Sequence, residues 1–352
     1  MEMNSYDIVM EMLRGNKDAV ERMPCVNSVS VATMDFMKAY DAYWPRAHFD
    51  PEKMARLGSA PHRVCGLDNV TIPFDMTMEA ELMGARINYH EDKIKWPSMF
   101  PDLAFHAKEI SDIKVPSDVS TTGRVPAIIS AIKILKNEFD GKVPVNVYVT
   151  PPFTSISSYV VDSIDFLKMV RSKPDKIHGF LKASMPIYRE LIRLFTDAGA
   201  DIITFHEMGG SNDNVSPKQW DEFMKPYLKE LIGCTKLPVI LNICGSALMI
   251  IDRMVECGAK GIAVDERTPI LKAREIVNRV NPKVAFMGNI PAFGIIHQAP
   301  PEDIKKFVKL VIDNGVDIVS PGCDFWLETP TEHIKAFVDA TIELGTPPSW
   351  KR

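Results

Sequence analysis

From about residue 140 onwards, the chain repeats one pattern of hydrophobic and polar positions. A short apolar or β-branched run ends in small or polar residues, and an amphipathic stretch with helical spacing follows it. Two similar runs lie upstream, so that the predicted strands cover residues 25–32, 70–74, 145–150, 201–205, 238–243, 261–265, 284–289 and 317–320. Eight strands that alternate with helices predict a closed parallel barrel, because this repetition covers both faces of the sheet.

Helical patterns separate the later strands, and local signals mark their ends. Gly199, Gly258 and Gly315 each stand where a helix should stop, and Ser216 followed by Pro217 is typical of a helix start. The predicted helices cover residues 156–171, 177–198, 217–232, 247–257, 270–280 and 301–314.

The pattern also predicts the domain organisation. No linker rich in Gly, Pro or Ser divides the chain, and barrels of this class often exceed 250 residues as one unit. We therefore expect residues 1–352 to form a single (β/α)8 TIM-barrel domain with an N-terminal helical extension. The segment from about 90 to 125 is expected to be a long excursion on one face of the barrel.

Composition changes this picture only by excluding partners and compartments. The net charge is −5 and no basic run occurs, which argues against nucleic acid and anionic membranes. No window approaches the roughly 18 apolar residues of a membrane span. The six cysteines are scattered, and the N-terminus lacks the basic start and apolar stretch of a secretory signal. Both features favour a reducing cytoplasm.

Chemistry in such a barrel belongs where strands end and the loops to the following helices begin. Cys244 and Cys323 follow the fifth and eighth predicted strands, and His206 follows the fourth. Each cysteine could simply be a small buried hydrophobe. Two thiols beside a histidine and an acidic residue favour a catalytic zinc site with an open position instead.

Three further polar residues at strand ends are candidates for catalysis. Asp75 follows the second strand, where it could cap a helix or face the barrel mouth. Asp265, followed by Glu266, closes the sixth strand and could pair with Arg267, bind the metal or contact a substrate. Asn242 precedes Cys244 by two positions at the end of the fifth strand.

Several motifs resemble the methylcobamide:coenzyme M methyltransferases, a branch of the uroporphyrinogen decarboxylase superfamily. The likeness covers essentially the whole chain, and the segment at 44–55 and the Ser-Pro-Gly-Cys sequence are its most specific parts. The matching pieces are Trp44-Pro-Arg-Ala-His48-Phe-Asp50-Pro-Glu-Lys-Met54-Ala, Val70-Thr-Ile-Pro-Phe-Asp75, Glu79-Ala-Glu-Leu-Met-Gly84, Trp96-Pro97-Ser98, Ser216-Pro217, Pro226-Tyr227-Leu228-Lys229, Gly288-Asn289-Ile290, Ser320-Pro321-Gly322-Cys323 and Thr329-Pro330.

The resemblance implies a (β/α)8 barrel that moves a methyl group between a corrinoid carried by a partner protein and a small donor or acceptor such as a thiol. It also implies zinc held by a His-x-Cys pair and a distant cysteine. Cys244 and Cys323 match two of those ligands, but Asn242 stands at the histidine position. His206 or Glu207 could complete the site, Asp265 or Glu266 could do so, or the zinc could be weak or absent.

Two other classes of function remain open at this stage. A decarboxylase-type lyase is suggested by Asp75, which aligns with the catalytic carboxylate of the decarboxylases. The chain lacks their N-terminal arginine motif after Pro24, however, and has Pro321-Gly322-Cys323 where they place a histidine. A non-catalytic corrinoid or metal handler is compatible with the asparagine at position 242.

Overall fold

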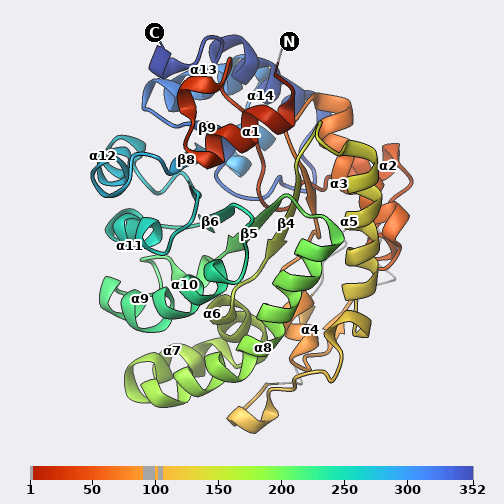
Figure 1. Cartoon of the computed structure of the whole chain (residues 1–352), viewed down its shortest axis with the longest axis vertical. Coiled ribbons are helices and arrows are strands. Elements are labelled where there is room, and N and C mark those ends of the chain that lie inside the picture. Colours follow the sequence, from red (N-terminus) through yellow and green to blue (C-terminus); the bar gives the residue numbers. More distant parts are fainter. Residues whose placement is uncertain (1–2, 90–99, 102–105, 352) are drawn as a thin grey trace.

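The computed structural model describes residues 3–89, 100–101 and 106–351. Helices surround a parallel sheet whose strands run in the order β1-β4-β5-β6-β7-β8-β9 (Figure 1). These strands are β1 (Val70–Ile72), β4 (Val145–Val149), β5 (Ile202–His206), β6 (Val239–Ile243), β7 (Gly261–Val264), β8 (Ala285–Ile290) and β9 (Ile318–Pro321). A separate antiparallel pair joins β2 (Ile87–Asn88) to β3 (Phe100–Pro101). Seven of the eight expected strands are thereby confirmed.

The expected first strand, 25–32, forms a single bridge, between Cys25 and Val319 of β9. On its other side, the Asp68 amide donates to the Cys25 carbonyl at 2.8 Å. The chain turns away directly afterwards, because Asn27 Oδ1 accepts the Val29 amide at 3.1 Å. Such a side-chain turn competes with strand pairing. This segment closes the barrel, but with far fewer ladder bonds than the pattern predicts.

The helices between the strands follow the expected positions with three differences. The predicted helix 217–232 is two helices that meet at Met224, and the predicted helix 156–171 begins as a π-helical turn, Ile156–Val160. In the predicted helix 247–257, only the second half is α-helical. The helices are α1 (Ser5–Arg14), α2 (Met34–Ala39), α3 (Pro51–Cys65), α4 (Met78–Leu82), α5 (Val125–Phe139), α6 (Pro152–Ser155), α7 (Ser163–Ser172), α8 (Pro174–Ala198), α9 (Pro217–Phe223), α10 (Lys225–Gly233), α11 (Ile251–Glu256), α12 (Ile270–Val280), α13 (Pro301–Asp313) and α14 (Thr331–Leu344).

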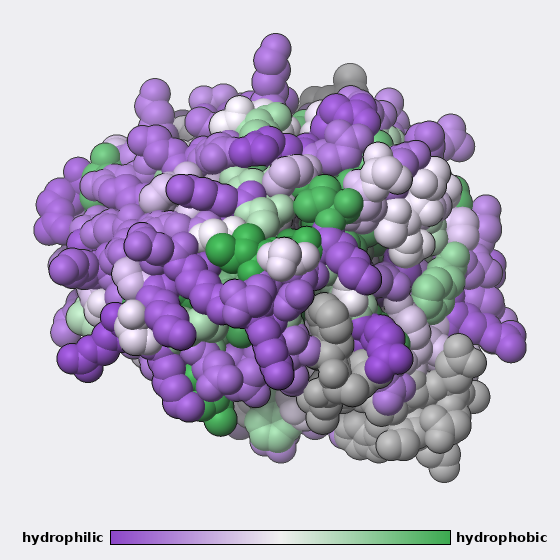
Figure 2. Space-filling view, turned by 90° about the horizontal axis from the view of Figure 1, so that it is seen from below, coloured by the Kyte–Doolittle hydropathy of each residue, from purple (hydrophilic) through white to green (hydrophobic). Residues whose placement is uncertain are grey.

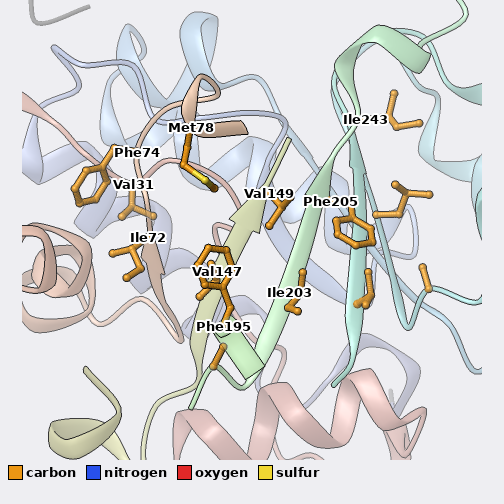
Figure 3. Packing of buried hydrophobic residues seen from close by; sticks show 14 of the residues in the cluster. Val31, Ile72, Phe74, Met78, Val147, Val149, Phe195, Ile203, Phe205 and Ile243 are labelled. Carbon is orange, nitrogen blue, oxygen red and sulfur yellow. The ribbon is translucent and has the colours of Figure 1, made fainter. Parts of the chain in front are cut away.

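Side chains that alternate along each strand divide the core into two parts. One set packs between the sheet and the helices, as Val147, Val149, Ile203 and Phe205 do in Figure 3. The other set faces the barrel interior and meets α1, whose Val9, Met12 and Leu13 cover the first residues of the strands. The N-terminal end of the barrel is therefore filled by apolar packing.

Above this apolar layer, the barrel interior is polar. The Thr204 hydroxyl donates to Asn146 Oδ1 at 2.8 Å, and Asn146 Nδ2 donates to Thr71 Oγ1 at 3.2 Å. The same alternation places His206 and Asn242, which are register partners on β5 and β6, one step nearer the C-terminal end. The fold thus directs these two side chains toward the barrel mouth.

The described helices include none that is both long and apolar enough to cross a lipid bilayer. The face seen in Figure 2 is largely hydrophilic, with small groups of hydrophobic side chains among the polar ones. Of the matching motifs, Trp96-Pro97-Ser98 lies outside the described residues, as does part of the expected excursion at 90–125.

Candidate metal and active site

The two cysteines singled out from the sequence meet at the C-terminal end of the barrel. Cys244 Sγ lies 2.7 Å from Cys323 Sγ and 3.3 Å from His206 Nε2. The sulfur separation exceeds the S–S bond length of about 2.05 Å, and both cysteines are free thiols. The structure therefore brings together the three residues expected to bind the metal.

Among the described residues, His206, Cys244 and Cys323 are the group whose ligand atoms all lie within 4.8 Å of one another. Burial lowers the pKa of His206 to about 4, so its ring is neutral at pH 7 and keeps a lone pair for a metal. The Cys323 side chain and burial raise the pKa of Cys244 well above its usual value. A thiol in this setting becomes a thiolate only when a cation replaces the proton.

Asn242 is buried on β6 beside the cluster. Its Oδ1 lies 3.7 Å from Cys244 Sγ, within reach of the thiol hydrogen. An amide oxygen is a weaker zinc ligand than a neutral imidazole. The His206 ring on the neighbouring strand β5 lies 3.3 Å from Cys244 Sγ, which makes it the candidate for the third ligand.

Asp265 lies at the mouth, but its carboxylate is occupied by the backbone. It accepts hydrogen bonds from the Gly245 amide and, at 2.9 Å, from the Arg267 amide. Asn289 Nδ2 donates to the Asp265 carbonyl at 2.9 Å and holds the same loop from the next strand. Asp265 is not within the 4.8 Å group, so it positions the Cys244-Gly245 turn rather than joining the three ligand atoms.

Two glycines allow the loops to approach each other. Gly245 has a φ of +105°, a conformation that favours glycine, and a Cβ there would lie 2.7 Å from Asp213 Oδ2. A Cβ on Gly322 would lie 2.7 Å from Glu266 Oε2. Both glycines directly flank a cysteine of the cluster, so a larger residue at either position would disturb the loops that carry the thiols.

Thr77, not Asp75, is the N-cap residue of α4, so Asp75 holds the preceding turn instead of capping the helix. Its Oδ1 accepts the Thr77 amide at 2.8 Å, which holds the turn before α4. Its Oδ2 pairs with Arg124 Nη1 and lies 3.3 Å from His48 Nδ1. Although burial alone would raise the pKa of Asp75, the Arg124 and His48 side chains lower it well below its usual value. Asp75 is thus a firmly ionised group near the mouth.

The sequence did not identify three ionisable residues around the site, of which Arg124 and Glu79 are buried and Asp324 is partly buried. Arg124 donates through Nε to Glu81 at 3.0 Å in addition to its pair with Asp75. Asp324 follows Cys323 and accepts the Ser30 amide at 2.7 Å, and burial raises its pKa to about 6. Glu79 accepts the Thr150 amide at 2.9 Å. Two of them had a signal: Asp324 directly follows a strand-end cysteine, and Glu79 begins one of the matching motifs.

Glu207, an alternative third ligand in the sequence, turns away from the thiols. It is buried beside His206 and accepts a hydrogen bond from Thr154 Oγ1. Burial raises the pKa of Glu207 to about 8, so this carboxyl group is largely protonated at neutral pH. The geometry therefore favours His206 over Glu207 as the third ligand.

The family model for uroporphyrinogen decarboxylase matches residues 5–344 of the chain. The chain belongs to the uroporphyrinogen decarboxylase family. It is similar to methylcobamide:CoM methyltransferase MtaA of Methanosarcina barkeri, with 29% identity over 92% of this chain and 94% of the relative. Similarity to methylcobamide:CoM methyltransferase MtbA of Methanosarcina acetivorans reaches 30% identity over the same shares, 92% and 94%.

A solved structure, described as a methyltransferase from Methanosarcina mazei, matches with a TM-score of 0.89 and 28% identity. The match covers 97% of this chain and 99% of that one. These similarities confirm the (β/α)8 barrel of this family and the methyltransferase branch expected from the sequence motifs.

We expect Glu79→Gln to stabilise the protein at neutral pH. Burial raises the pKa of Glu79 to about 8, and its Oε2 has no hydrogen-bond partner among the described residues. Folding at pH 7 therefore takes up a proton that the unfolded chain, with a pKa near 4.5, does not hold. Stability should fall as pH rises from about 4.5 to 8, by up to about 3 kcal/mol at pH 7.

Urea unfolding of both proteins between pH 4.5 and 8 measures this effect. The advantage of Glu79→Gln should grow with pH and vanish near pH 4.5. Glu332→Gln, at an exposed position in the first turn of α14, is the matched control and should show no such trend. A pH-independent difference would mean that Glu79 is ionised in the folded protein.

Proposed function

We propose that this protein is a corrinoid-dependent methyltransferase that moves a methyl group between a methylcobamide on a partner protein and a small thiol, with zinc bound at the barrel mouth. The observation that carries the proposal is the convergence of His206, Cys244 and Cys323 on one point. Similarity to two methylcobamide:CoM methyltransferases over nine-tenths of the chain supports it.

The donor set fits zinc. Two sulfur atoms and one imidazole nitrogen form a catalytic site when one position is left for a substrate. Zinc bound there would remove the proton of a substrate thiol and keep its sulfur nucleophilic at neutral pH. His206 would bind through Nε2, the ring nitrogen nearest the thiols, and Cys244 and Cys323 through Sγ.

The remaining residues position the reacting groups. Asp265 fixes the Cys244-Gly245 turn through its backbone hydrogen bonds, and Asn242 offers a polar contact beside the open position. In the transfer step, the substrate sulfur forms a bond to the methyl carbon and the carbon–cobalt bond breaks. The electron pair of the broken carbon–cobalt bond stays on the cobalt of the methylcobamide substrate, which passes from cobalt(III) to cobalt(I). The proton of the substrate thiol goes to solvent.

The partner and the compartment follow from the same chemistry. The corrinoid arrives on a separate corrinoid protein, and the chain acts as one domain over residues 1–352. Thiols 2.7 Å apart would be prone to form a disulfide in an oxidising compartment. We therefore place the protein in the reducing cytoplasm.

Metal analysis combined with a methylcobalamin assay tests the function. Protein purified without chelators should hold about one zinc per chain and demethylate methylcobalamin only when a thiol is added. The decarboxylase alternative is disfavoured because Arg124 already pairs with the Asp75 carboxylate. Conversion of uroporphyrinogen to coproporphyrinogen, or methyl transfer by zinc-free protein, would contradict the proposal.

His206 and Asn242 allow a direct test of the third ligand. We expect His206→Ala to weaken zinc binding by at least about tenfold, because it removes one of three ligands. Asn242→His should tighten binding, and in the double variant it should recover part of the loss, since the two positions are register partners on neighbouring strands. Competition with a chromogenic chelator measures the affinity.

The control is His178→Ala, which removes a half-buried histidine that contacts Tyr227 on α10. It should leave zinc affinity unchanged. If His206→Ala also left zinc affinity unchanged, the third ligand would have to come from another side chain.

A further inference from the structure

A cavity of about 500 Å³ opens beside the two thiols at the barrel mouth. Its walls combine acidic and aromatic side chains. Around Cys244 and Cys323 it is lined by the acidic residues Asp265, Glu266 and Asp324, the aromatic residues Trp44, Phe74, Phe293, Phe325 and Trp326, and by Ser30, Ala32, Ala292 and Leu327.

The lining contains three carboxyl groups and, among the described residues, no lysine, arginine or histidine. Two arginines close to the lining are paired with carboxylates. Arg267 forms an ion pair with Asp213 at 3.0 Å, and Arg124 lies between Asp75 and Glu81. A zinc ion with two thiolates adds no net charge to the site. The ionisable side chains among the described lining residues are therefore acidic, apart from the two thiols.

The aromatic residues of the lining also favour a positively charged ligand. Phe293 and Trp326 stand edge to face with ring centroids 4.9 Å apart, and their side chains are 47% and 45% exposed. Trp44 and Phe74 form a second pair on the wall, with centroids 6.1 Å apart. The faces of such rings attract cations, by about 0.5–2 kcal/mol each, and their negative potential disfavours an anion at the same place.

We propose that this cavity selects a small thiol substrate that carries a positive charge, such as an ammonium group, and rejects anionic thiols. The inference rests on the proposed function, since the thiol group is what binds at the metal. An anionic substrate would lose its hydration without gaining a cationic partner, whereas an ammonium group gains carboxylates and aromatic faces.

Three two-carbon thiols test this preference in the zinc-loaded protein: 2-aminoethanethiol, 2-mercaptoethanol and 2-mercaptoethanesulfonate, which are cationic, neutral and anionic. Calorimetry measures their binding, and methylcobalamin demethylation measures their reaction. We expect 2-aminoethanethiol to bind at least about tenfold more tightly than the sulfonate, with the neutral thiol between them. Equal binding, or tighter binding of the sulfonate, would overturn the inference.

Variants separate the charge of the cavity from the intrinsic reactivity of the thiols. Glu266→Gln and Asp324→Asn should each reduce the ratio of cationic to anionic binding by at least about threefold. Glu328→Gln is the matched control, because it removes an exposed carboxylate four residues after Asp324 that does not line the cavity. A ratio that is unchanged in both cavity variants, or equally reduced in the control, would contradict the role of the lining.

The two proposals fail in different ways. If none of the thiols binds and none is methylated, the methyltransferase proposal fails and the inference fails with it. If all three react but the sulfonate is preferred, the methyltransferase proposal stands and only the charge selection is wrong.

Discussion

The double variant Cys244→Ala, Cys323→Ala is expected to lose both its zinc and all thiol-dependent methyl transfer. The two thiols are 2.7 Å apart and supply two of the three ligand atoms at the barrel mouth. Histidine alone cannot hold zinc at ordinary concentrations, so the loss should be complete rather than partial. Elemental analysis of the purified variant and the methylcobalamin assay measure the two effects.

Cys234→Ala provides the control for the loss of a thiol. Cys234 is exposed after α10, away from the mouth, and its removal should change neither zinc content nor activity. Zinc retained by the double variant, or methyl transfer that persists without zinc, would show that the metal mechanism is wrong. Asn242 would then be better interpreted as a hydrogen-bonding group for a substrate that is not a thiol.

Arg124→Met is expected to cause the largest loss of stability of any single change proposed here. The Arg124 side chain is only 1% exposed and pairs with two carboxylates, those of Asp75 and Glu81. Removing it leaves negative charges in a poorly hydrated place, which typically costs about 3–5 kcal/mol. Urea unfolding at pH 7 measures the change in the free energy of unfolding.

An exposed arginine with the same kind of partners is the matched control. Arg193 pairs with Glu190 and Asp197 on the exposed surface of α8, so Arg193→Met should cost far less stability than Arg124→Met. Adding Asp75→Asn and Glu81→Gln to Arg124→Met should restore part of the stability. Similar costs for the two methionine variants would mean that the buried cluster is not held together by charge.

The sequence predicts the barrel well because the same local pattern, an apolar strand followed by an amphipathic helix, repeats along the chain. It fails where polar side chains replace backbone pairing. The Asn69 side chain accepts the Asn27 amide at 3.1 Å and donates to the Asn27 carbonyl at 2.7 Å. The segment at residue 27 is therefore joined to the start of β1 by a side chain and not by a backbone ladder. Hydrophobic periodicity does not predict a connection made by side-chain hydrogen bonds. The division at Met224 is also hidden, since apolar spacing continues across it.

In the candidate site, residues at strand ends could be predicted from the sequence, whereas residues placed by long-range side-chain contacts could not. Cys244, Cys323 and His206 could be identified because strand-end residues of a barrel converge at one end. Arg124 could not, because it reaches Asp75 across 49 positions and no spacing rule connects them. Glu79 was hidden for a different reason. An acidic residue in the first turn of a helix is normally solvated, and only the packing of α4 against α8 shows that this one is buried.

Helix α1 covers the N-terminal end of the barrel, opposite the thiols, and this position matters for the design of the proposed experiments. The last described residues lie at the same end of the barrel, since Trp350 Nε1 donates to the Lys17 carbonyl at 3.2 Å and Lys351 Nζ to the Val20 carbonyl at 2.7 Å. Figure 1 shows the two chain ends near each other on that side. An affinity tag or surface attachment at either terminus therefore points away from the thiols and leaves the opening accessible to small molecules and to a protein carrying a corrinoid.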